Sequence, residues 1–64
     1  MKLVIEIDLG AGAVPADVTG EVGRILRYWA GNLKHYELVD GTAETLTDST
    51  YAPVGQWRIE GPPG

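Results

Sequence analysis

The sequence contains no cysteine and a single histidine among its 64 residues. Without cysteine it forms no disulfide and no thiolate zinc site, and one histidine cannot build a histidine metal site alone. Small domains without disulfides or metals have thin cores, and a partner chain often adds the missing stability. We therefore expect no bound metal and consider a protein partner or a homodimer the remaining source of stability.

The sequence also lacks a long apolar run and an excess of basic residues. No stretch approaches the roughly 18 apolar residues that cross a bilayer, and the apolar start of the chain is interrupted by Glu6 and Asp8. We expect no signal peptide, no membrane contact and a cytoplasmic location. The formal net charge of -4 opposes non-specific nucleic-acid binding, so nucleic acid is not the expected partner.

What remains is the composition of a globular protein, with 44% hydrophobic and 22% charged residues. A chain of 64 residues has room for one core only. We predict a single α+β domain over residues 1–60, followed by a disordered tail at 61–64 that is rich in proline and glycine.

The clearest patterns are one strand and one helix. Residues 2–9 alternate in polarity, which predicts a strand with one buried face, formed by Leu3, Ile5, Ile7 and Leu9. After a loop with two glycines and a proline, Asp17 is a candidate N-cap for a helix. That helix has an apolar stripe at steps of three and four, formed by Val18, Val22, Ile25, Leu26, Trp29 and Leu33.

Two further strands are predicted near residues 44–47 and 54–60, joined by a loop longer than a tight turn. The order strand, helix, strand, strand leaves two sheet orders. Order 1-3-2 makes all pairs antiparallel, whereas order 1-2-3 pairs the first two strands in parallel. We favour 1-3-2. In either case Leu3, Ile5 and Ile7 are expected to share a dry seam with Val22, Ile25 and Trp29 of the helix.

No residue pattern indicates catalysis. The stretch Gly10-Ala11-Gly12 resembles the start of a dinucleotide fingerprint, but Pro15 occupies its third glycine position and the chain is too short for that sheet. Glu6 and Asp8 share a strand face without a third ligand, and His35 has no nucleophile in a recognisable motif. We expect a non-enzymatic protein with no cofactor and no small-molecule substrate.

Two surfaces are candidates for binding. The sheet face away from the helix is a possible partner-binding face, with Val4, Glu6, Asp8, Gln56 and Arg58. A basic helix stripe is the alternative, a nucleic-acid site formed by Arg24, Arg27, Tyr28 and Lys34. In addition, an unpaired edge strand could add to the sheet of a partner or of a second copy.

Three segments carry a resemblance. The strand Lys-Leu-Val-Ile-Glu-Ile-Asp-Leu, the helix stretch 21–27 and the ending 45–59 are similar to small uncharacterised proteins of actinobacteria and their bacteriophages, of the mycobacteriophage accessory type. Gly23 and residues 49–53 depart from the alanine and the Asn-Gly turn that are frequent there. The resemblance implies a phage accessory protein in a bacterial host cytoplasm, but it assigns no activity to any residue.

Overall fold

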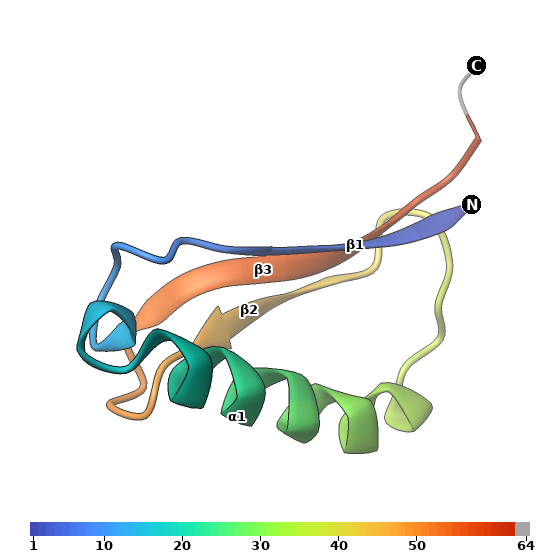
Figure 1. Ribbon diagram of the computed structural model, residues 1–64. Coiled ribbons are helices and arrows are strands. Elements are labelled where there is room, and N and C mark those ends of the chain that lie inside the picture. Colours follow the sequence, from blue (N-terminus) through green and yellow to red (C-terminus); the bar gives the residue numbers. More distant parts are fainter. Residues whose placement is uncertain (63–64) are drawn as a thin grey trace.

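The computed structural model describes residues 1–62 as one helix packed on one sheet (Figure 1). In chain order the elements are β1 (Lys2–Ile7), the 3-10 helix η1 (Val14–Ala16), α1 (Val18–Asn32), the 3-10 helix η2 (Leu33–His35), β2 (Ala43–Thr47) and β3 (Pro53–Glu60). The predicted α+β fold with β-α-β-β order is confirmed. Residues 63 and 64 of the predicted tail lie outside the described residues.

The sheet has the order β1-β3-β2 with both pairs antiparallel, which confirms the favoured topology. In the β1–β3 ladder Ile5 pairs with Trp57 and Val4 pairs with Arg58. The β2–β3 ladder shifts register between Leu46 and Thr47, just before the loop that connects the two strands. The long loop expected there is thus accompanied by an irregular strand end.

The helix begins where its sequence predicts. The side chain of Asp17 accepts a hydrogen bond from Gly20 N–H at 3.2 Å, and Glu21 places negative charge in the first turn. Both features satisfy or complement the free N–H groups of a helix start. After Asn32 the chain continues into the 3-10 helix η2, and Tyr36, which follows it, packs against the core.

The core lies between α1 and the central strand. Trp57 of β3 is 1% exposed and Ile25 of α1 is 2% exposed. The rest of the buried core comes from η1, β2 and β3 and consists of Val14, Leu46, Val54 and Ile59. Trp29, Leu33 and Tyr36 pack against this core while remaining partly exposed.

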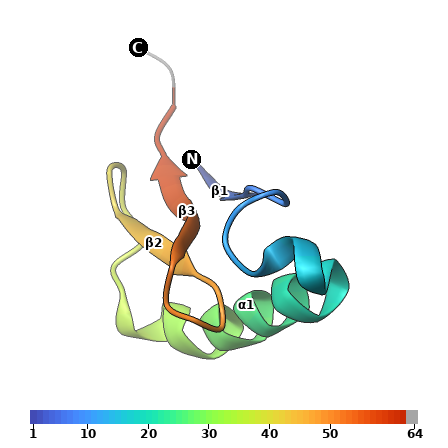
Figure 2. The same cartoon turned by 90° about the vertical axis from the view of Figure 1, so that its left-hand side faces the viewer.

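The prediction that β1 and α1 share a buried seam is wrong for Leu3 and Ile5. Leu3 and Ile5 are 41% and 42% exposed, although both lie on the helix side of the sheet with Trp57 and Ile59. A helix is about 10–12 Å wide and strands are about 4.8 Å apart, so one helix covers about two strands. Figure 2 shows why β1 is the strand left uncovered: α1 runs obliquely, from the side of β1 at its N-terminal end to the side of β2 at its C-terminal end.

A buried carboxylate joins the connection between β1 and α1 to the loop between β2 and β3. Asp48, 1% exposed, accepts hydrogen bonds from Ala13 N–H at 2.7 Å, Thr50 N–H at 2.8 Å, Thr50 O–H at 2.6 Å and Ala52 N–H at 3.0 Å. These hydrogen bonds favour the charged form and hold the pKa of Asp48 far below its usual range. Gly12, with φ of 54°, lies so close that a side chain there would meet this carboxylate.

Candidate functional site

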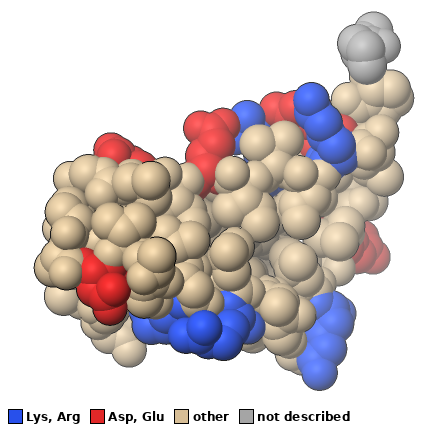
Figure 3. Space-filling view, in the orientation of Figure 1, with Lys and Arg blue, Asp and Glu red and all other residues tan. Residues whose placement is uncertain are grey.

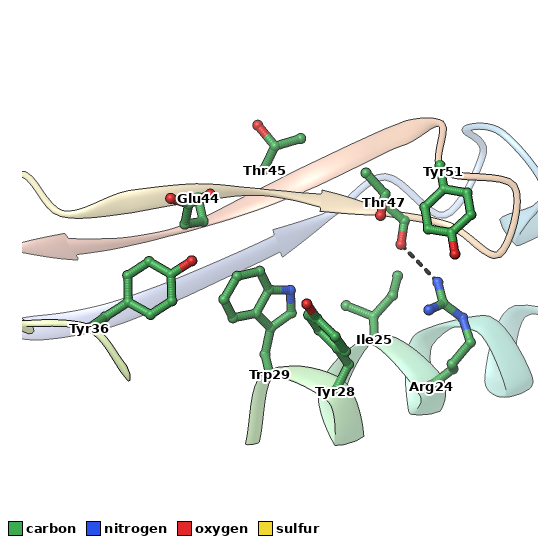
Figure 4. A pocket seen from close by; sticks show the side chains of 9 residues that line it. All are labelled: Arg24, Ile25, Tyr28, Trp29, Tyr36, Glu44, Thr45, Thr47 and Tyr51. Atoms are coloured by element: carbon green, nitrogen blue, oxygen red, sulfur yellow. Dashed lines mark hydrogen bonds between the residues drawn. The ribbon is translucent and has the colours of Figure 1, made fainter. Parts of the chain in front are cut away.

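A cavity of about 500 Å³ opens between α1 and β2. Figure 4 shows its side chains arriving from both elements and from the segments that follow them. Helix α1 supplies Arg24, Ile25, Tyr28 and Trp29, while β2 and the β2–β3 loop supply Glu44, Thr45, Thr47 and Tyr51. Tyr36, which follows η2, completes the lining. The cavity therefore exists only once the helix has docked against the β2 side of the sheet.

Aromatic rings form one wall of this cavity. The ring of Trp29 meets Tyr28 edge to face with centroids 5.3 Å apart, and it meets Tyr36 at a tilted angle at 5.7 Å. Behind them, the buried Trp57 contacts both Trp29 and Tyr36 edge to face. These contacts fix the ring orientations, so the cavity has a preorganised aromatic surface.

Two opposite charges line the same cavity, and they differ in their partners. The guanidinium of Arg24 donates to the Thr47 carbonyl oxygen at 2.8 Å (Figure 4) and lies 3.7 Å from Glu21. Glu44 is exposed and makes no ion pair or side-chain hydrogen bond among residues 1–62. Arg24 thus has a carbonyl and a carboxylate partner within the fold, although its Nε has no hydrogen-bond partner among residues 1–62, whereas Glu44 has neither kind of partner there.

The negative charge of Glu44 affects its aromatic neighbour. Partial burial raises the pKa of the Tyr36 phenol, and the nearby carboxylate of Glu44 raises it further. Tyr36 is therefore neutral over the whole physiological range. The cavity therefore offers a ligand apolar ring surface, phenol groups, one carboxylate and the guanidinium of Arg24.

Two of the five residues predicted for the partner-binding sheet face, Glu6 and Arg58, form an ion pair with each other. By register, Val4, Glu6, Gln56 and Arg58 lie on the side away from the helix, as expected from alternation. Arg58 pairs with Glu6 and, at 2.8 Å, with Glu60, which also lies 3.6 Å from Lys2. These carboxylates raise the pKa of Arg58, and Arg58 lowers that of Glu60. Asp8 follows the end of β1 and accepts from Gly10 N–H at 2.8 Å.

The predicted basic stripe does not form one surface. Arg24 and Tyr28 line the cavity, Arg27 folds over Gly23, and Lys34 lies beyond α1 in η2. The space-filling view shows basic atoms along the helix side in two separate groups with uncharged surface between them (Figure 3). With one of its three cations used inside the fold, the stripe offers few phosphate contacts.

The sequence pattern missed Glu44 and Tyr36 as site residues. Glu44 lies directly opposite Trp57 in the β2–β3 ladder, and this places it on the helix side of the sheet. A charged residue at an inward position of a strand is the signal that could have identified it. Tyr36 gave no such signal, because its position depends on the 3-10 turn that redirects the chain.

Other kinds of site find little support. Residues 1–62 contain no group of three or more acidic or histidine side chains that could hold a metal ion. None of the helices described is both long and apolar enough to cross a membrane. Comparisons with models of protein families, with curated proteins and with solved structures find no match.

Proposed function

We propose that this protein is a non-enzymatic binding module that docks on another protein by accepting a basic side chain into the cavity between α1 and β2. The observation that carries the proposal is Glu44, an unpaired carboxylate beside the aromatic wall of Tyr28, Trp29 and Tyr36. An arginine or lysine side chain satisfies both features, through an ion pair and through contact with the ring faces. This role agrees with the phage accessory function that the resemblance implies.

The outer edge of β2 supports an extended partner segment. β2 pairs with β3 alone in the sheet of residues 1–62, so half of its backbone groups face outward. A peptide that adds alongside such an edge directs alternate side chains to each face of the sheet. One of them would then point to the helix side, where the cavity opens.

The charge balance of the molecule also favours a basic partner. The formal net charge is -4. Arg24 has Glu21 and a backbone carbonyl as partners, whereas Glu44 has no counter-ion among residues 1–62. A partner surface rich in arginine or lysine is therefore complementary.

Two blocked peptides test the proposal, Gly-Gly-Arg-Gly-Gly and its counterpart with neutral citrulline in place of arginine. We expect the arginine peptide alone to shift the indole N–H resonance of Trp29 in ¹H–¹⁵N spectra and to quench tryptophan fluorescence, with weak, millimolar affinity. The substitution Glu44→Gln should reduce that affinity about fivefold, the size of one exposed cation contact.

The matched control is Glu37→Gln, which removes the same charge from an exposed residue outside the cavity lining. Its affinity for the arginine peptide should stay within about twofold of the wild type. Equal binding of the arginine and citrulline peptides, or equal losses in the two variants, would contradict the proposal.

A further inference from the structure

The opposite edge of the sheet has an unsatisfied backbone and an uncovered apolar face. β1 pairs only with β3 within residues 1–62. Because Asp8 N–H donates to Val54 O at 2.8 Å, the alternation of an antiparallel ladder makes Lys2, Val4 and Glu6 exchange hydrogen bonds with β3. The N–H and C=O groups of Leu3, Ile5 and Ile7 therefore point away from the sheet.

These outward groups lie beside exposed apolar side chains. Leu3 and Ile5 are 41% and 42% exposed on the helix side of β1, and Leu26 of α1 is 43% exposed. At 100° per residue, Leu26 lies about 160° around the helix from Arg24 and Tyr28, which line the cavity on the β2 side. The three apolar side chains thus belong to the half of the molecule that the oblique helix leaves open.

The sequence of β1 is complementary to itself. When two copies run antiparallel with Val4 opposite Val4, Lys2 of each copy faces Glu6 of the other, and Leu3 faces Ile5. Opposite charges and apolar pairs placed in this way stabilise a two-stranded ladder. A shift by two residues puts Glu6 opposite Val4 and moves the partner of Lys2 to Asp8, which lies beyond the end of β1.

The hydrogen-bond geometry is compatible with this register. In this alignment the residues that face each other with free backbone groups are Leu3 and Ile5, so each such pair exchanges two hydrogen bonds. A two-fold axis through Val4 places both helices on one side of the joined sheet, each with its C-terminal end on the side of its own β2. The space beside β1 on the helix side is therefore free to hold the Leu3 and Ile5 side chains of both copies.

We propose that two copies of this chain associate through β1, in antiparallel register centred on Val4, to form a continuous six-stranded sheet. The occupant of the β1 edge is thus a second copy. The proposal concerns a different edge from the cavity at β2 and does not depend on it.

A charge-exchange series tests the register. Sedimentation equilibrium of the wild-type chain between about 5 µM and 1 mM should show a monomer–dimer equilibrium. Lys2→Glu alone and Glu6→Lys alone should each weaken dimerisation about tenfold or more, because each places like charges opposite one another twice per dimer. The double variant Lys2→Glu with Glu6→Lys should return to within about threefold of the wild type.

The double variant also separates contacts between chains from contacts within one chain. Inside one copy it places a glutamate near Glu60 and a lysine near Arg58, so intrachain effects alone would make it the worst of the three. Ile5→Lys should abolish the dimer, whereas Leu9→Lys, at an exposed residue beyond β1, should leave it intact. Circular dichroism of each variant at 5 µM checks that the monomer is folded.

Isotope-filtered NMR on a mixed labelled and unlabelled sample should show contacts between Leu3 of one copy and Ile5 of the other. A strict monomer at 1 mM, or a dimer indifferent to all three charge variants, would overturn the proposal. Peptide binding at the Glu44 cavity is measured separately at 5 µM, so loss of one interaction is distinguishable from loss of the other.

Discussion

The two outer strands of the sheet, β1 and β2, differ in how far the leucine on their helix side is buried. On the helix side of β2, Leu46 is 1% exposed and a guanidinium from α1 binds the last carbonyl of the strand, while Glu44 stays exposed beside the cavity. The helix side of β1 is open, with Leu3 41% exposed. Both strands present leucine towards the helix, so apolar character does not decide which strand is buried. The direction of α1 across the sheet does.

The loops at one end of the molecule fix that direction. Asp48 binds Ala13 in the connection between β1 and α1, and it also binds the turn between β2 and β3. Next to it, Ser49 N–H donates to Glu21 of α1 at 3.0 Å. The N-terminal end of the helix is therefore held to the β2–β3 loop, and a single helix that leaves from this point cannot cover both edges.

The largest expected difference between the two edges comes from a pair of identical substitutions. Leu46→Ala on β2 should lower the free energy of unfolding by about 2–5 kcal/mol, because it leaves a cavity in a packed core. Leu3→Ala on β1 should lower it by about 1 kcal/mol or less, since that side chain is already partly hydrated. Urea denaturation at 5 µM measures both, and equal losses would mean that β1 is covered in solution.

The Asp48 carboxylate gives the second effect, which depends on pH. Its pKa is lower in the folded than in the unfolded chain, so the stability it contributes is complete above pH 5 and is lost as the pH falls below about 4. Asp48→Asn should lower the thermal midpoint at pH 7 and flatten its decline between pH 5 and pH 3. A smaller slope should remain from Glu60, whose pKa Arg58 also lowers.

The control for this measurement is Asp8→Asn. Asp8 is exposed and accepts one backbone hydrogen bond, from Gly10. We expect a pH profile close to that of the wild type. If both variants shift the profile equally, the buried position of Asp48 is not the cause.

A smaller loss of stability should follow when the hydrogen bond from α1 to the last residue of β2 is removed. Arg24→Met removes the hydrogen bond to the Thr47 carbonyl while keeping most of the apolar stem, and it should cost about 1 kcal/mol. Arg27→Met removes the same charge from an exposed residue of α1 and should change stability by less than half as much. Chemical denaturation of the two variants, at equal salt, makes the comparison.

The smallest effect is a difference in amide exchange that needs no substitution. At 5 µM the Leu3 and Ile5 amides should exchange quickly, because they point outward, whereas the Leu46 amide faces β3 and should be protected. At 1 mM the β1 amides should slow as the second copy pairs with them. Exchange that is independent of concentration at Leu3 and Ile5 would argue against pairing at this edge.

Local sequence patterns predicted the elements, because each rests on local chemistry, whereas they left two sheet orders open. Alternation placed β3 and most of β1, the three- and four-residue stripe placed α1, and Asp17 marked the start of α1. The first strand ends at Ile7, so the prediction that it continues to a buried Leu9 is wrong. The coverage of the sheet was not predictable in this way. Periodicity predicts on which face of β1 the Leu3 side chain lies, but it does not predict how much of that face the helix covers.

The residues of the candidate site were even harder to predict from the sequence. The cavity needs Tyr36, Glu44 and Arg24 to meet, and these residues come from segments joined by irregular turns. The basic stripe was predicted from one helix and the sheet face from two strands. The structure pairs Arg58 of this face with Glu6 across strands and binds Arg24 of the stripe to the Thr47 carbonyl. Which charges are paired is a property of the assembled fold.

The hydrogen bond between Ala13 and Asp48 has a consequence for the order of folding. It joins residues 35 positions apart, whereas the bonds from Asp48 to Thr50 and Ala52 span two and four. Short loops close quickly and at low entropic cost, so the turn around Asp48 can form before the first third of the chain has folded. The carboxylate is then in place to accept the Ala13 amide, and this long-range hydrogen bond ties the segment before α1 to the turn between β2 and β3.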